Sequence, residues 1–300
     1  MTNQTTHNPE MSKQMAESPG FIAALDQSGG STPKALRGYG VSEDAYSNDE
    51  EMFALIHAMR SRIVTAPCFN GEKVIGAILF ERTMDGEADA MPVPQKLWQR
   101  GVVPFLKVDK GLADQDDGVQ LMKPMPELDA LCERAVAKGI FGTKMRSVIH
   151  EASETGTNAI VDQQFAVAAQ IAGHGLMPII EPEVNIKSET RTECDAILHD
   201  AVKRHLDAMP DSQQVMLKLS IPATPNLYGD LVAHPRVMRV VALSGGFSRD
   251  EACSALARNP GMIASFSRAL LQDLRQDMDD SGFDKALGSA IDEIYRASMA

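Results

Sequence analysis

The sequence is poor in cysteine and in positive charge, and it has no long apolar run. Its four cysteines (Cys68, Cys132, Cys194 and Cys253) form no C-x-x-C pair, which indicates reduced thiols in a cytoplasmic protein rather than a disulfide framework. Lysine and arginine number 29 against 41 acidic residues, and the net charge of −12 argues against nucleic acid or a membrane surface as the main partner. No run reaches membrane-spanning length, and no hydrophobic signal core stands at the start.

Several catalytic motifs are also absent. The seven histidines show no H-x-H or H-E-x-x-H spacing, and no G-x-S-x-G elbow occurs. No G-x-G-x-x-G follows the first apolar run, which counts against a dinucleotide-binding fold. The sequence therefore predicts chemistry without a metal or a cofactor.

Short apolar runs alternate with amphipathic segments along the chain. Helical periodicity covers 51–64 and 196–209, and Ser248 with Glu251 predicts a capping box before a further helix. The strand-like runs lie at 21–26, 75–80, 103–109, 140–146, 176–183, 214–220, 237–244 and 261–267. Eight such repeats predict an α/β fold, a (β/α)8 TIM barrel, with a doubly wound open sheet as the alternative.

The predicted barrel is a single domain over 19–300 that ends in a helical segment, preceded by a flexible N-terminal segment over 1–18. Active sites of barrels gather at the C-terminal ends of the strands. Charged or hydroxyl side chains end nearly every predicted strand. They are Asp26, Glu81, Lys107, Asp109, Lys144, Arg146, Glu181, Glu183, Lys218, Ser244 and Arg268.

Three of these residues are lysines inside apolar strands, namely Lys107, Lys144 and Lys218. Burial disfavours the ammonium form and lowers the pKa of a lysine, which can then attack a carbonyl as a neutral amine. The resulting imine withdraws electrons, so that a carbon–carbon bond can break to leave a neutral enamine. The structural alternative is that each lysine only pairs with a carboxylate, but the three together favour a catalytic site.

Carboxylates stand at the ends of two other predicted strands. Glu181 and Glu183 are two residues apart and face the same side of their strand, where one of them can keep a proton for general acid–base work. Asp26 precedes a donor-rich loop with Ser28 and Ser31, suited to a substrate hydroxyl and a phosphate. The alternatives are counterions for the lysines and ordinary helix caps.

A second predicted phosphate site follows the last two strands. Ser244, Gly245 and Gly246 end the seventh strand, and glycine-rich loops at this place in barrels bind phosphate through exposed N–H groups. Arg268, after the eighth strand, adds a forked cation for phosphate oxygens.

From about Phe21 to Gln272, the chain resembles the class I (Schiff-base) fructose-1,6-bisphosphate aldolases in their shorter bacterial form. The stretches that carry the resemblance are ALDQSGGS from 24, LKVDKG from 106, KMR from 144, PIIEPE from 178, LK at 217, LSGG from 243 and SFSRAL from 265. It implies a (β/α)8 barrel that cleaves fructose 1,6-bisphosphate reversibly into dihydroxyacetone phosphate and glyceraldehyde 3-phosphate, as in glycolysis and gluconeogenesis.

The resemblance also implies roles for single residues. Lys218 matches the imine-forming lysine, and Glu181 the general acid/base around the imine. Glu183 and Lys144 match residues that assist imine formation, and Asp26 matches the group that polarises or deprotonates the C4 hydroxyl. The substrate-binding residues are Ser244, Gly245, Gly246 and Arg268 for the C1 phosphate, and Ser28, Ser31, Lys107 and Arg146 for the remainder, with Ser31 and Lys107 toward the C6 phosphate.

The chain departs from the animal-type members at several positions. Gln27 replaces a glutamate and Met145 a tryptophan, and the chain ends at Ala300, short of the tail that carries a catalytic tyrosine. Tyr295 has no motif match to that tyrosine, so Glu181 is the candidate for its proton transfer. The alternatives are another Schiff-base barrel aldolase or transaldolase, or a non-catalytic sugar-phosphate binder. The sequence does not decide between a monomer and a homo-oligomer.

Overall fold

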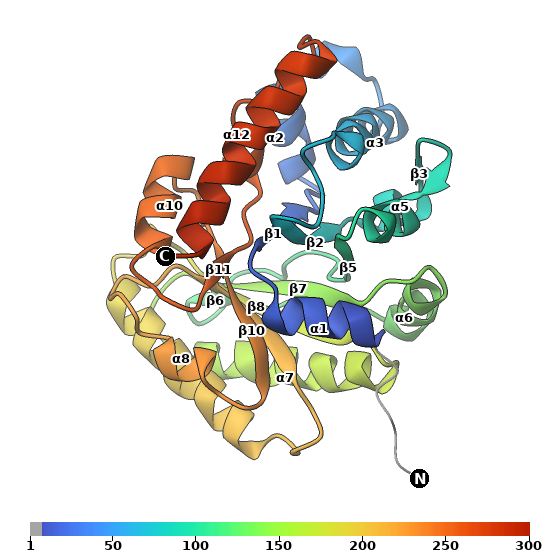
Figure 1. The fold of residues 1–300 in the computed structure, drawn as a ribbon. Helices are drawn as coiled ribbons and strands as arrows, with labels where there is room; N and C mark the ends of the chain where they lie inside the picture. The colour runs from blue at the N-terminus through green and yellow to red at the C-terminus, as the bar shows by residue number, and fades with distance from the viewer. Residues whose placement is uncertain (1–7) are drawn as a thin grey trace.

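The computed structural model describes residues 8–300, and its centre is a ring of parallel strands (Figure 1). In chain order these are β1 (Phe21–Leu25), β2 (Val74–Leu79), β5 (Val103–Lys107), β7 (Gly142–Ile149), β8 (Met177–Val184), β9 (Val215–Ser220), β10 (Val237–Leu243) and β11 (Ile263–Ala264). Each pairs in parallel with the next. The Ala24 N–H donates to the Phe266 carbonyl at 3.1 Å and joins the first strand to the last segment. The predicted eight-stranded barrel is confirmed, and the open sheet is excluded.

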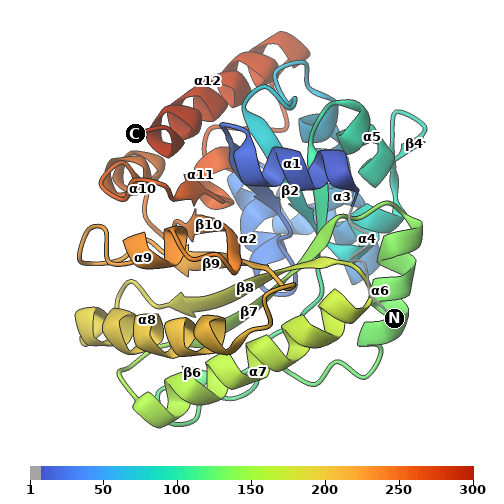
Figure 2. The ribbon, with the colours of Figure 1, turned by 60° about the horizontal axis from the view of Figure 1, so that its bottom comes forward.

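Helices surround this ring (Figure 2). They are α2 (Ser31–Gly38), α3 (Asp49–Thr65), α4 (Glu81–Asp85), α5 (Val93–Gln99), α6 (Leu128–Ala137), α7 (Glu154–Gly173), α8 (Arg191–Ala208), α9 (Gly229–Val232), α10 (Arg249–Leu256), α11 (Arg268–Leu271) and α12 (Asp280–Ser298), with a 3-10 turn at Glu43–Ala45. Helices α3 and α8 match the two predicted helices, and Ser248 and Glu251 form the predicted capping box of α10. Short strands complete the structure: β6 (Val119–Gln120) runs antiparallel to β7, and β3 (Glu87–Ala88) pairs with β4 (Met91–Pro92).

Side chains of alternate strand positions fill the barrel. Ile22, Ile78, Phe105, Ile179 and Met216 belong to one buried cluster in its interior. Residues two positions further along a strand face the same side. The side chains two positions after these hydrophobic residues therefore also point inward. They lie one layer nearer the C-terminal ends of the strands.

The N-terminal end of the barrel is covered by a helix that the sequence reading did not predict. Residues 9–17, assigned there to a flexible segment, form α1 (Pro9–Glu17), in which Met11 and Met15 are buried. The Gln14 amide donates to the Ile75 carbonyl at 2.8 Å, and Arg239 donates to the Met15 carbonyl at 2.9 Å. Figure 1 shows α1 across this end of the strands. The rest of the predicted flexible segment, 1–7, lies outside the described residues. Within residues 8–300, no helix is long and apolar enough to cross a membrane.

Candidate active site

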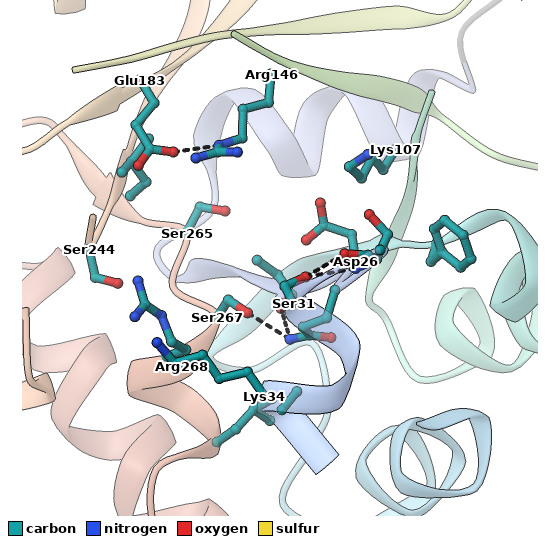
Figure 3. Close-up of a pocket in the computed structure, with 18 of the residues that line it drawn as sticks. Asp26, Ser31, Lys34, Lys107, Arg146, Glu183, Ser244, Ser265, Ser267 and Arg268 are labelled. Atoms are coloured by element: carbon teal, nitrogen blue, oxygen red, sulfur yellow. Dashed lines mark hydrogen bonds and ion pairs between the residues drawn. The ribbon is translucent and has the colours of Figure 1, made fainter. Parts of the chain in front are cut away.

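A cavity of about 1210 Å³ opens at the C-terminal ends of the strands, opposite α1. Every polar strand-end residue named from the sequence lines it, as do Ser28, Ser31, Gly245 and Gly246. Figure 3 shows the side chains converging from opposite walls, with Arg146 and Glu183 on one side and Ser267 and Arg268 on another. The fold therefore gathers in one place the side chains that the sequence indicated separately.

Glu181 joins two lysines at the floor of the cavity. Its Oε1 lies 3.1 Å from the Lys218 Nζ, and its Oε2 lies 2.8 Å from the Lys144 Nζ. Lys144 also contacts Asp26, with 2.7 Å between Nζ and Oδ2. Glu181, Lys144 and Lys218 are at most 4% exposed. The backbone N–H of Glu181 donates to the Gln164 amide oxygen at 2.8 Å, which fixes the strand where the carboxylate leaves it.

The charges of this cluster shift the pKa values of two members strongly. Burial would raise the pKa of the Asp26 carboxyl, but the positive charges of Lys144, Lys218 and Lys107 hold it well below its usual range. Burial would lower the pKa of Lys144, but Asp26 and Glu181 raise it above the ordinary lysine value. The sequence-based expectation of a lowered pKa is therefore wrong for Lys144, because two carboxylates outweigh its loss of hydration. This raised pKa favours the charged form of Lys144 beside its two carboxylates.

Two further ion pairs line the walls. The Arg146 Nε lies 2.5 Å from Glu183 Oε2, and the Lys107 Nζ lies 2.6 Å from Asp109 Oδ1. Burial would lower the pKa of Arg146, but Glu183 raises it. Glu183 and Glu181 both line the cavity, as the alternation along the strand predicts, but Glu183 contacts an arginine instead of the buried lysines.

The loops after β10 and β11 leave room for an anion. Gly245 has a φ of +60°, and a Cβ there would lie 2.5 Å from the Ile186 Cγ2, so any other residue would be strained and crowded. A Cβ on Gly246 would lie 3.4 Å from Arg268 Nη2. Within residues 8–300, Arg268 has no ion pair with a carboxylate, whereas Arg146 and Lys107 each have one. Its guanidinium is therefore available to a ligand.

The loop after β1 is closed by its own hydrogen bonds. The Ser31 hydroxyl donates to the Ser28 carbonyl at 2.8 Å and accepts from the Ser28 N–H at 2.9 Å. Lys34 lines the cavity one turn further along α2. Both serines face the cavity, although their hydrogen-bonding groups are partly used within the loop.

The sequence reading missed some polar residues of this cavity. Ser265 is 1% exposed, and its hydroxyl has no hydrogen-bond partner in the part of the chain that the structure describes. Ser265 lies three residues before Arg268, and Lys34 lies three residues after Ser31. Their closeness in sequence to these predicted site residues was the only sign in the sequence that could have indicated them. Tyr295, on α12, packs against the outer core and is not among the cavity-lining residues of 8–300.

Comparisons with known proteins agree on one family. A family model for class I fructose-bisphosphate aldolases matches residues 9–222, well over half of the chain. A fructose-bisphosphate aldolase of Plasmodium falciparum, solved with TRAP and a small-molecule inhibitor, superposes with a TM-score of 0.72 at 18% identity, over 97% of this chain and 94% of that one. A fructose-bisphosphate aldolase of Slackia heliotrinireducens gives a TM-score of 0.51 at 12% identity, over 96% and 89% of the two chains. The two superpositions support the fold, and the family match supports the activity.

Proposed function

This chain belongs to the class I fructose-bisphosphate aldolase family, and we propose that its strand-end cavity performs the family's reaction with Lys218 as the imine-forming residue. The observation that carries the assignment is the shared Glu181 carboxylate, whose two oxygens reach Lys218 and Lys144 separately. Lys144 keeps a second carboxylate, Asp26, and so stays charged, which leaves Lys218 as the lysine suited to nucleophilic attack.

The proposed reaction begins at the C2 carbonyl of fructose 1,6-bisphosphate. The Lys218 amine attacks C2, and Glu181 donates the proton with which the carbinolamine oxygen leaves as water. Asp26 then removes the proton of the C4 hydroxyl while the C3–C4 bond breaks. The bonding electrons move to C3 and the imine nitrogen as an enamine, and glyceraldehyde 3-phosphate departs. Protonation at C3, which we assign to Glu181, and hydrolysis release dihydroxyacetone phosphate and restore Lys218.

The two phosphates fit opposite parts of the cavity. Gly245 N–H and Arg268, which has no carboxylate partner among residues 8–300, are suited to the C1 phosphate, together with Ser244 and Gly246. Lys107 and Ser31 are assigned to the C6 phosphate, with Ser28 and Arg146 lining the space between. Lys107 is paired with Asp109, so phosphate binding exchanges one anionic partner of this lysine for another.

A cytoplasmic setting and a role in glycolysis or gluconeogenesis belong to the same proposal. They are supported by the family and by four cysteines that form no disulfide. Measurement of the mass in solution will distinguish a monomer from a homo-oligomer.

The test is borohydride reduction with dihydroxyacetone phosphate in EDTA, followed by peptide mass mapping. We expect an adduct on Lys218 and loss of activity, and neither in Lys218→Met. Lys110→Met is the matched control, since this lysine also lines the cavity but pairs with Glu81 at its rim. An adduct on Lys144 or Lys107 would overturn the assignment of the nucleophile. Cleavage of fructose 1-phosphate in preference to the bisphosphate would favour a single-phosphate aldolase, and no turnover of either a binding protein.

A further inference from the structure

Arg60, on α3, is a buried cation behind the cavity that the reaction described above does not use. It is 1% exposed, and no carboxylate in residues 8–300 forms an ion pair with it. Burial lowers the pKa of Arg60 to about 10, although the negative charge of Asp26 acts to raise it. An unpaired buried charge costs several kcal/mol, so its other contacts indicate what the residue does.

Two of the three hydrogen bonds of Arg60 go to Gln27, and its guanidinium carbon also lies 5.9 Å from the centroid of the Phe80 ring. The Arg60 Nη2 donates to the Gln27 carbonyl at 2.5 Å and to the Gln27 Oε1 at 3.2 Å, while Nη1 donates to Thr83 Oγ1 at 2.8 Å. Because a guanidinium only donates, the amide oxygen of Gln27 must face it. The amide nitrogen is thereby turned away, and it donates to Ser267 Oγ at 2.6 Å and to the Ala24 carbonyl at 3.2 Å.

The hydrogen bond from Gln27 to Ser267 crosses the seam of the barrel, which is the junction between the first strand, β1, and the last strand, β11. Gln27 directly follows Asp26, and Ser267 directly precedes Arg268. Few backbone contacts hold the chain at this seam. Strand β11 pairs with β10 over only two residues, and the Ala24 N–H of β1 donates to the carbonyl of Phe266, just after β11. Figure 3 shows Ser267 and Arg268 on one wall and Asp26 on another. The side-chain bridge therefore adds a second link between the two segments that carry Asp26 and Arg268.

We propose that Arg60 is a positioning residue that acts through Gln27 to hold Asp26 and Arg268 in register. The inference rests on the proposed function, because it assigns the C4 hydroxyl to Asp26 and the C1 phosphate to Arg268. Gln27 suits this task as an amide, which accepts from Arg60 and donates to Ser267 at the same time. Arg60 does not line the cavity, so its hydrogen bonds reach the reacting groups through Gln27, while its charge acts on Asp26 from a distance.

The test is a double-mutant cycle of Arg60→Met and Gln27→Leu, with kcat and KM measured for fructose 1,6-bisphosphate. We expect each single variant to lose about 10- to 100-fold in kcat/KM, because small misplacements of reacting groups have effects of this size. The double variant should lose no more than about twofold beyond the worse single variant, since both changes break one bridge. Thr83→Val is the control: it removes the other hydrogen-bond partner of Arg60 and should stay within about threefold of wild type.

Two measurements separate positioning from mere stability. Millimolar methylguanidinium should restore activity to Arg60→Ala but leave Gln27→Leu unchanged. Thermal unfolding identifies any variant that fails to fold, and Gln27→Leu, which leaves Arg60 in place, then carries the test. The proposal would be overturned if the fold-losses in kcat/KM of the two single variants multiplied in the double variant. It would also be overturned if Thr83→Val lost as much activity as Arg60→Met. Wild-type turnover and its Lys218 adduct are measured first, so failure of the proposed function is seen separately.

Discussion

Replacement of Glu181 by glutamine keeps the shape of this side chain and removes its charge. The amide can still accept from one lysine, but its nitrogen then faces the other cation. Lys144 retains Asp26, so the larger loss falls at Lys218, which the shared carboxylate contacts at 3.1 Å. A hydrogen bond to a charged group contributes about 1.5–3 kcal/mol, and general acid–base catalysis contributes about 10²- to 10⁴-fold. We therefore expect kcat to fall by about 10³-fold, or about 4 kcal/mol in activation free energy.

The assay is steady-state cleavage of fructose 1,6-bisphosphate, together with the rate of borohydride-trapped adduct formation on Lys218. Both should fall in Glu181→Gln, because both steps need a proton moved at the imine. Glu183→Gln is the matched control, since it neutralises a carboxylate two residues away that contacts Arg146 instead of the buried lysines. We expect that control to lose about tenfold or less. A Glu181→Gln enzyme with kcat within threefold of wild type would refute the role of the shared carboxylate.

Three further predictions test other parts of the structure. Lys107→Met should raise KM for fructose 1,6-bisphosphate about tenfold or more and leave fructose 1-phosphate kinetics nearly unchanged; equal effects on both would refute the C6 assignment. The lowered pKa of Asp26 means that its ion pair with Lys144 stabilises the fold above about pH 4 and that this contribution is lost as the pH falls further. Because Lys144 keeps Glu181, Asp26→Asn should be about 1.5–3 kcal/mol less stable near pH 7, and its urea midpoint should fall less on acidification; parallel wild-type and variant pH curves would contradict this. Met15→Ala should lower the free energy of unfolding by about 2–5 kcal/mol with kcat unchanged, because Met15 is fully buried at the end of the barrel opposite the cavity; a fall in kcat with unchanged stability would contradict it.

The strands and most of the cavity were predictable because both follow from local pattern. Lys107, Lys144 and Lys218 each end an apolar run, and a parallel barrel brings such ends together. The register also puts Lys107 beside Lys144. Helix α1 was missed because residues 9–17 are largely polar, and the two methionines that it buries gain their burial only against the finished barrel.

Long-range electrostatics and cross-chain bridges were less accessible. The pKa of Lys144 depends on Asp26, 118 positions earlier, and on Glu181, 37 positions later, and only the fold sets both distances. Arg60 lies within an ordinary helical pattern of α3, with no local sign that it reaches Gln27. The resemblance to aldolases indicated candidate substrate-binding residues, but not the contact between Arg60 and Gln27 behind them.

The cavity divides into a compensated centre and a cationic end, and this division suits a phosphorylated ketose. Lys144 and Lys218 share Glu181, and Lys144 also has Asp26, so the centre can move protons without holding a large net charge. Arg268, in contrast, has no carboxylate partner within residues 8–300 and lies beside Gly246, where a phosphate can complete its neutralisation. Binding energy gained at that end can orient C2 over Lys218. Arg268→Met should therefore lower kcat as well as raise KM, and a change in KM alone would mean that the phosphate only anchors the substrate.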